Sequence, residues 1–198
     1  MAVVQPSPAA TVVLVRDSAK GIEVLMLLRN SRLAFNGGHW VFPGGKIDTR
    51  DYQTGSEQLE YPAARNAAVR ETREETGIII DHKDLIHTAH WTTPEHLPRR
   101  FSTWFFLCPL YKKVKVNVDQ GEILDYRWIS PADALTAPQD GHFKVPRPTR
   151  VTLKDLLVYS HVDELLSGIR KLDIRVFPAG SEFYRPLEMG FDSNADLS

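Results

Sequence analysis

The chain has 198 residues, of which 42% are hydrophobic and 25% charged, so it can bury a sizeable core. Its formal net charge of −1 provides no basic field, which argues against nucleic acids and anionic membranes as partners. The single cysteine, Cys108, excludes an intrachain disulfide and lies in an apolar run, where a buried, unreactive thiol is expected. The N-terminus lacks the pattern of a secretory signal, and no apolar run reaches membrane-spanning length, so a cytoplasmic location is expected.

Runs of apolar or alternating residues predict strands at 10–15, 22–28, 40–42, 85–91, 100–107, 111–118 and 123–129. A charged insertion is expected at 48–61, and a helix with small residues on its packed side follows at 63–76. After the last strand, Ser130 is a suitable cap for a helix at 131–135. Strands mixed with packed helices indicate an α/β layered fold.

The pattern changes in the C-terminal quarter of the chain. The run 146–149 contains two prolines and is interpreted as a stiff linker, followed by helices at 152–159 and 162–171. The tail from 177 to 198 is expected to be irregular, with its last residues disordered. We therefore predict one domain at 8–145 and a helical extension with an irregular tail at 146–198. Two roles stay open for this extension: it caps a site, or it forms a homodimer interface.

The most informative stretch is Arg-Glu-Thr-Arg-Glu-Glu-Thr-Gly at 70–77. It places Glu71, Glu74 and Glu75 at helical spacings of three and four on one face, where like charges repel. Glu74 and Glu75 also lie in the last turn, where the helix dipole disfavours anions. A bound divalent cation would reconcile both features. The alternative is a solvated helix face on which Arg70 pairs with Glu74.

A Pro-Gly-Gly turn at 43–45 precedes this helix, and its backbone can closely approach an ion or phosphate. Together the two segments resemble the Nudix hydrolase family, whose pattern is Gly, five residues, Glu, seven residues, Arg-Glu, two residues, Glu-Glu, one residue and Gly. The matching residues are Gly45, Arg70, Glu71, Glu74, Glu75, Gly77 and Ile78. Thr72 stands at an aliphatic position of the pattern. The stretch from Gly45 to Arg70 is longer than the pattern, and Pro62 occupies the place of the first Glu, with Glu57 and Glu60 as candidates to replace it.

The resemblance implies a Nudix α/β/α sandwich with a mixed sheet and a requirement for Mg²⁺ or Mn²⁺. The expected metal ligands are the carboxylates of Glu71, Glu74 and Glu75 and, by resemblance, the backbone carbonyl of Gly44. Arg70 is expected to hold a carboxylate, either Asp48 or a helix glutamate, through a bidentate pair. The general base is left open between Glu71 and Glu122. Four basic residues are candidates for binding substrate phosphates, namely Arg29, Arg32, Arg99 and Arg100.

Residues 38–45, the long insertion and residues 93–106 are similar to the acyl-CoA diphosphatase branch, although Ala34 stands where the CoA signature has Arg. We therefore predict metal-dependent hydrolysis of the pyrophosphate bond in a nucleoside diphosphate linked to another moiety, with CoA or acyl-CoA as the first candidate substrate. One alternative is an ADP-ribose or ADP-sugar pyrophosphatase, and another is a catalytically weak, nucleotide-binding regulator. No zinc site is expected at His82, His87 and His90, because they straddle a loop and a strand with no cysteine nearby.

Overall fold

The computed structural model describes residues 4–33, 35–53, 59–138 and 143–192. Within them the strands are β1 (Ser7–Ser18), β2 (Gly21–Arg29), β3 (Trp40–Val41), β4 (Gly44–Lys46), β5 (Ile86–Thr92), β6 (Phe101–Pro109), β7 (Ile123–Ile129) and β8 (Arg175–Phe177). The helices are α1 (Glu60–Thr76), α2 (Pro131–Thr136), α3 (Arg147–Leu156) and α4 (Val162–Ile169), with short 3₁₀ turns η1 (Thr49–Asp51) and η2 (His82–Asp84).

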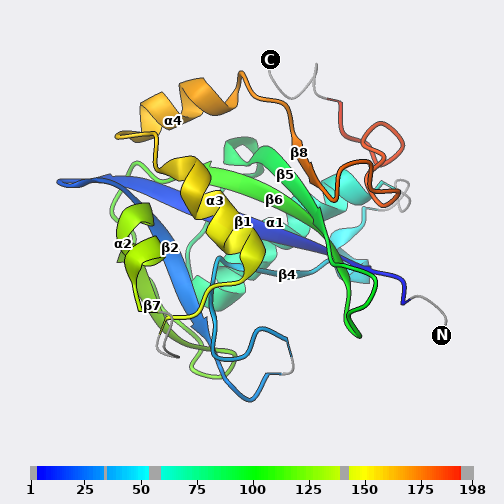
Figure 1. Ribbon diagram of the computed structural model, residues 1–198, viewed down its shortest axis with the longest axis horizontal. Coiled ribbons are helices and arrows are strands. Elements are labelled where there is room, and N and C mark those ends of the chain that lie inside the picture. The colour runs from blue at the N-terminus through cyan, green and yellow to red at the C-terminus, as the bar shows by residue number, and fades with distance from the viewer. Residues whose placement is uncertain (1–3, 34, 54–58, 139–142, 193–198) are drawn as a thin grey trace.

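These strands form one mixed sheet with the order β3-β2-β1-β6-β5-β8, to which β4 adds beside β1 and β7 beside β2. The pair β1–β6 is parallel, whereas β1–β2 and β5–β6 are antiparallel. Helix α1 lies on one face of the sheet, and α2, α3 and α4 lie on the other (Figure 1). The predicted α/β/α sandwich with a mixed sheet is confirmed.

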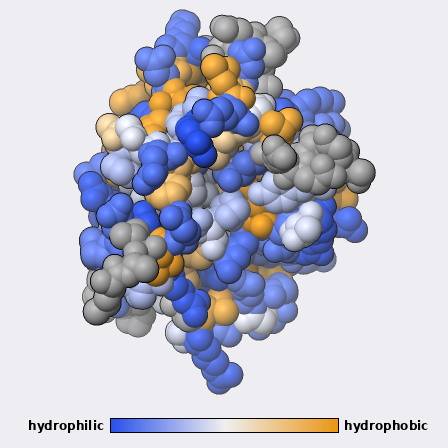
Figure 2. Space-filling model, turned by 90° about the vertical axis from the view of Figure 1, so that its right-hand side faces the viewer, coloured by the Kyte–Doolittle hydropathy of each residue, from blue (hydrophilic) through white to orange (hydrophobic). Residues whose placement is uncertain are grey.

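Side chains alternate between the two faces of the central strands, as the period of a strand requires. Leu25 and Leu27 of β2 pack toward α1, whereas Met26 between them packs toward Leu153 of α3 and Leu165 of α4. All five side chains are fully buried, so both helical layers share the sheet as their core. On the face drawn in Figure 2, hydrophobic residues lie in several separate groups among hydrophilic ones. No helix among the described residues combines the length and the apolar character needed to span a membrane.

Helix α1 packs closely on the sheet through four alanines, which are all buried: Ala63, Ala64, Ala67 and Ala68. The helix ends at Gly77, whose φ of 71° is the left-handed conformation that favours glycine. It begins at Glu60, slightly before the predicted start. The Glu60 carboxylate accepts a hydrogen bond from Trp104 Nε1 at 2.7 Å. The predicted carboxylate helix is therefore confirmed, with its small-residue stripe facing the sheet.

The strand predicted at 111–118 is wrong. Val116 is buried and Val114 and Val118 are half-buried against the core, while the alternating residues Lys113, Lys115 and Asn117 are exposed, so the predicted alternation is present. The segment nevertheless forms no strand in the described sheet. It runs past the end of α1, where the Asn117 amide donates to the Thr76 carbonyl at 2.8 Å. Alternating apolar residues indicate only that one side of a segment is buried. Here the end of a helix, not the edge of a neighbouring strand, covers that side.

The linker predicted at 146–149 is also wrong, because this run is the start of α3. Pro146 is the N-cap and Pro148 lies in the first turn, where a missing N–H interrupts no helical hydrogen bond. The two C-terminal helices are confirmed, with α3 starting earlier than predicted. Both helices pack on the sheet. The division into residues 8–145 and 146–198 stays a prediction, as does a homodimer interface.

The C-terminal tail is irregular in part, but it is anchored to the sheet. Strand β8, which the sequence did not predict, pairs in parallel with β5, and Phe177 stacks on Trp91 with ring centroids 3.8 Å apart. Further along, Phe191 packs edge-on against Tyr61 of α1, and the Met189 carbonyl accepts from the Tyr61 amide at 2.9 Å. The expected disorder of the last residues concerns 193–198, which lie outside the described part of the chain.

Candidate functional site

A glycine pair at the start of β4 brings the sheet against α1. Gly44 has a φ of +152°, and a Cβ atom there would lie 2.3 Å from the Ala10 carbonyl oxygen. A Cβ atom at Gly45 would lie 2.4 Å from Oε1 of Glu71. Only glycine therefore allows β4 to pair with β1 and the Glu71 carboxylate to lie against the turn.

Glu75 is the most buried glutamate of the site, with 5% of its surface exposed. The Gly44 amide donates to its Oε2 at 2.9 Å, and Arg29 Nη1 lies 3.6 Å from its Oε1. Burial raises the pKa of Glu75 to about 8. The hydrogen bond from the Gly44 amide and the charge of Arg29 oppose this shift, whereas the charges of Glu71 and Glu122 add to it. The folded protein thus holds a carboxylate whose negative charge is poorly compensated.

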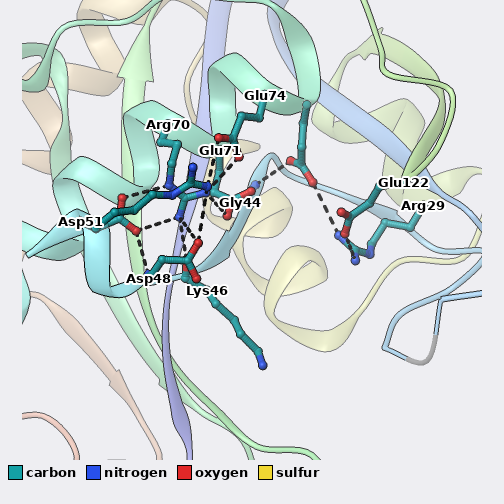
Figure 3. A network of polar contacts seen from close by, with 11 residues as sticks. Arg29, Gly44, Lys46, Asp48, Asp51, Arg70, Glu71, Glu74 and Glu122 are labelled. Atoms are coloured by element: carbon teal, nitrogen blue, oxygen red, sulfur yellow. Dashed lines mark hydrogen bonds and ion pairs between the residues drawn. The ribbon is translucent and has the colours of Figure 1, made fainter.

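Glu71 and Glu122 lie close enough to Glu75 to act on its charge. Burial raises the pKa of Glu71, the Arg70 hydrogen bond and charge oppose this, and Glu74 and Glu122 add to it. Glu122 comes from the loop before β7 and pairs with Arg29 at the end of β2. In Figure 3, Arg29 and Glu122 lie on one side of Gly44, whereas Arg70 and Asp51 lie on the other. Mutual repulsion among these acids is the electrostatic signature expected where a cation binds.

Arg70 is the centre of a second group of contacts. Its Nε and Nη2 donate to the two oxygens of Asp51 at 2.9 and 2.8 Å, which is a bidentate pair. Its Nη1 donates to Glu71 at 2.6 Å and to Glu74 at 3.0 Å, and Nη2 also donates to the Lys46 carbonyl at 2.9 Å. The hydrogen bond with Asp51 is the main cause that raises the pKa of Arg70. Arg70 thereby ties η1, β4 and the acidic face of α1 together.

The expected bidentate partner of Arg70 must be corrected. Asp48 is only a distant neighbour, with its Oδ2 3.8 Å from Arg70 Nη2. The helix glutamates do contact Arg70, as predicted, but each through a single nitrogen. The bidentate partner is Asp51, which the sequence interpretation missed.

A signal for Asp51 was present in the sequence. Five residues follow Gly45, and the next is Asp51, which therefore stands at the place of the first Glu in the family pattern. The extra residues therefore lie between Asp51 and Arg70, at 52–69 where the pattern has seven, and Pro62 belongs to α1. Glu60 does not replace the first Glu, because its carboxylate is bonded to Trp104. Glu57 lies outside the described residues. The acidic partner of Arg70 is thus retained, as an aspartate.

Two groups of predicted site residues are placed differently by the structure. Glu74 turns away from Glu75 toward Arg70 and Arg50, and Nη2 of Arg50 lies 3.2 Å from Oε1 of Glu74.

Among the candidate phosphate-binding arginines, only Arg29 contacts the carboxylates in the described structure. Arg32 and Arg99 are exposed, and Arg100 is buried. The Arg100 guanidinium instead donates to the carbonyls of Thr93 and Val4, which anchors the N-terminal segment.

The residues present fit a hard divalent cation in their chemistry. Among the described residues, no three Asp, Glu, His or Cys side chains already converge as a metal-binding group. The acids that surround the Gly44–Gly45 turn nonetheless supply the oxygen donors that Mg²⁺ and Mn²⁺ prefer. The buried Nε of Arg29 has no hydrogen-bond partner, so this arginine is not fully satisfied by the acids alone. The ligand set Gly44, Glu71, Glu74 and Glu75 stays a prediction.

The histidines lie elsewhere. His87 and His90 are buried among aromatic rings including Trp104 and Tyr184, and burial lowers their pKa values to about 3 and about 4. His82 begins η2, and its Nε2 lies 2.9 Å from Oδ1 of Asn66.

A mixed sheet between helices, with a glutamate-rich helix packed on a Gly-Gly turn, is the architecture of the Nudix fold. The NUDIX domain family matches residues 6–148, and the chain belongs to this family. A solved NUDIX hydrolase from Alicyclobacillus acidocaldarius is 27% identical and aligns with a TM-score of 0.72 over 84% of this chain and 97% of its own. Nudix hydrolases generally use divalent metals such as Mg²⁺ or Mn²⁺.

Two curated relatives are similar over most of this chain. A Caenorhabditis elegans protein named “Putative nudix hydrolase 7” is 27% identical over an alignment 175 positions long, gaps included, which covers 71% of this chain. The acyl-coenzyme A diphosphatase NUDT19 of Xenopus laevis is 22% identical over an alignment 241 positions long, gaps included, which covers 76% of this chain. The alignments span 57% and 63% of the lengths of these relatives.

Proposed function

We propose that this protein is a divalent-metal-dependent pyrophosphohydrolase that cleaves a nucleoside diphosphate linked to another moiety. The observation that carries the proposal is the buried Glu75 carboxylate, held by the Gly44 amide at 2.9 Å beside Glu71, Glu122 and Arg29. A buried acid with a pKa raised to about 8 is costly to keep ionised. Clustered acids of this kind are typical of sites that use cation binding for catalysis.

Each residue has a distinct part in this proposal. A bound Mg²⁺ or Mn²⁺ would neutralise the pyrophosphate charge and lower the pKa of a bound water. Glu71, Glu74 and Glu75, with the Gly44 carbonyl, would hold it. Arg70 keeps Glu71 in place, because its guanidinium is itself fixed by the bidentate pair with Asp51.

Arg29 and Glu122 have the remaining roles. The Arg29 side chain is 16% exposed and would bind a substrate phosphate. The proton of the attacking water would pass to Glu71 or to Glu122, whose side chain is 48% exposed and thus accessible to substrate. Substituting each of these two glutamates by glutamine and comparing the pH–rate profiles identifies the base, because only its loss removes the acidic limb.

CoA or an acyl-CoA is the first substrate we propose. Support comes from the segments 38–45 and 93–106 and from the similarity to a relative named acyl-coenzyme A diphosphatase. Ala34, which stands at the place of an arginine in the CoA signature, lies outside the described residues. Arg29 supplies a basic group that is already at the carboxylates. An ADP-ribose or ADP-sugar pyrophosphatase and a nucleotide-binding regulator remain as the outcomes against which CoA is tested.

Product identification by mass spectrometry tests the proposal. Wild type and Glu75→Gln are incubated with CoA, acetyl-CoA, ADP-ribose and a dinucleoside polyphosphate, each with Mg²⁺, Mn²⁺ or EDTA. We expect metal-dependent release of 3′,5′-ADP and a 4′-phosphopantetheine product from the CoA compounds, and its loss in the variant. Release of AMP from ADP-ribose alone would replace CoA by the alternative substrate. Binding of these compounds without turnover would contradict the proposed hydrolase activity and favour a role as a nucleotide-binding regulator.

A further inference from the structure

The long insertion affects how Asp51 is held against Arg70. Asp51 must hold Arg70 through a bidentate pair, yet residues 52–69 separate the two, where the family pattern has seven. The conformational freedom of a connection grows with its length, so the chain itself restrains Asp51 less than a short connection would. Another contact must therefore fix the η1 turn against α1.

Asn66 makes that contact. It lies on α1 one turn before Arg70, so its side chain emerges on the same side of the helix. Its Nδ2 donates to the backbone carbonyl of Asp51 at 2.7 Å. The same residue whose carboxylate binds Arg70 is thus held through its carbonyl by Asn66. Two contacts from successive turns of α1 fix the position and the orientation of Asp51.

The other end of the Asn66 amide is fixed by the turn that follows the helix. Its Oδ1 lies 2.9 Å from His82 Nε2, which donates when that nitrogen carries a proton. The η2 turn is itself held on α1, because Arg65 Nη2 donates to the His82 carbonyl at 2.6 Å. The amide of Asn66 therefore has a donor on one side and an acceptor on the other, and it cannot rotate without losing both.

We propose that Asn66 is a positioning residue for the reaction. Together with His82 it holds Asp51, Asp51 holds Arg70, and Arg70 holds Glu71 against the Gly44–Gly45 turn. The inference rests on the proposed hydrolase function, because Glu71 is a metal ligand or base only in that reaction. Asn66 touches neither Glu71 nor Glu75 in the described contacts, and it acts through the arginine.

The kinetic test compares Asn66→Ala and Asn66→Asp with Arg73→Ala, which removes an exposed side chain from the same helix. Loss of a residue that orients a ligand typically lowers activity about 10- to 100-fold, so we expect kcat to fall at least about tenfold with KM within about twofold. Asn66→Asp should be no better than the alanine variant, because an aspartate cannot donate to a carbonyl. Arg73→Ala should retain wild-type kcat. A lower melting temperature with unchanged kcat in both Asn66 variants would overturn the inference.

A double-mutant cycle tests whether Asn66 acts through Asp51. Asp51→Ala should itself lower kcat, and adding Asn66→Ala should then lower it by less than about twofold more, since residues in one network are not additive. If kcat of the double variant fell by the product of the two single-variant losses, Asn66 would act by another route and the proposed chain of contacts would be overturned.

Hydrogen exchange tests the same contacts without relying on catalysis. The η1 turn contains amides protected by local bonds, such as Asp51 to the Asp48 carbonyl at 2.9 Å. Asn66→Ala should accelerate exchange in a peptide spanning 47–53 and leave β6 unchanged, whereas Arg73→Ala should alter neither. If wild type hydrolyses none of the compounds, the proposed function fails but this measurement still decides the structural role of Asn66. Unchanged exchange at 47–53 would overturn that role.

Discussion

Replacing Glu75 by glutamine should stabilise the metal-free protein at pH 8 while removing hydrolysis. The pKa of Glu75 is raised to about 8 from 4.5, chiefly by burial. Between these pH values the folded state retains a proton that the unfolded chain has lost. Stability therefore falls as pH rises from 4.5 to 8, because the unfolded state binds fewer protons there. Glutamine resembles the neutral acid, keeps an acceptor for the Gly44 amide and escapes this penalty.

The size of the effect follows from the shift. A rise of about 3.5 pKa units, at about 1.4 kcal/mol per unit, sets an upper bound of about 5 kcal/mol. Glu71 and Glu122 also raise the pKa of Glu75, and they continue to act on each other once glutamine replaces it, so part of the repulsion at the site persists in the variant. The loss of the Arg29 contact at 3.6 Å opposes the gain. We expect a net stabilisation of about 2 kcal/mol at pH 8, or roughly 4–8 °C in melting temperature for a domain of this size.

Thermal unfolding in EDTA, followed by circular dichroism from pH 8 downward, measures this gain. The advantage of Glu75→Gln should shrink as pH falls and disappear below about 4.5, the unfolded-state pKa. Glu74→Gln is the matched control, because its carboxylate is 47% exposed and its replacement should change stability by less than about 1 kcal/mol. Addition of Mn²⁺ should stabilise wild type more than the variant, since only wild type keeps all the proposed metal ligands. A variant no more stable than wild type at pH 8, or equally stabilised at every pH, would refute the reasoning.

Three further predictions concern other parts of the chain. Gly45→Ala places a Cβ atom 2.4 Å from Glu71 Oε1, so the flexible carboxylate must move. We expect kcat to fall about 10- to 100-fold while the melting temperature changes little. Retention of full activity would contradict this geometry. The pKa values of His87 and His90 are lowered to about 3 and about 4 by burial, so the unfolded state takes up protons first and stability should fall as pH drops from 6.5 toward these values. Because Glu75 acts in the opposite direction over this range, the test uses the Glu75→Gln background. Urea unfolding between pH 7 and 5 should there show a loss of about 2 kcal/mol per histidine, and adding His87→Phe should reduce that slope. Burial raises the pKa of the Cys108 thiol to about 12, so a thiol reagent should label it only after unfolding, and rapid labelling of the native protein would contradict its burial.

Several features were predictable from the sequence because each is encoded within a few neighbouring residues. The alanine stripe and Gly77 predicted α1 and its packed face, and the glutamates of its last turns indicated the acidic site. Alternation gave the correct burial at 111–118 but the wrong element. Whether a strand edge or a helix end covers an alternating segment depends on its neighbours, which lie far away in the sequence.

The pairings at the site were decided by tertiary structure. Arg29 and Glu122 lie 93 positions apart and meet only because β2 pairs with β7 in the sheet. Asp51 is the partner of Arg70 because α1 lies beside the η1 turn in the fold, although residues 52–69 separate the two in the sequence. Local propensity and periodicity specified the helix, the strands and the acids. The distances between those acids and their partners depend on the register of strands and on how α1 packs on them, which no short segment contains.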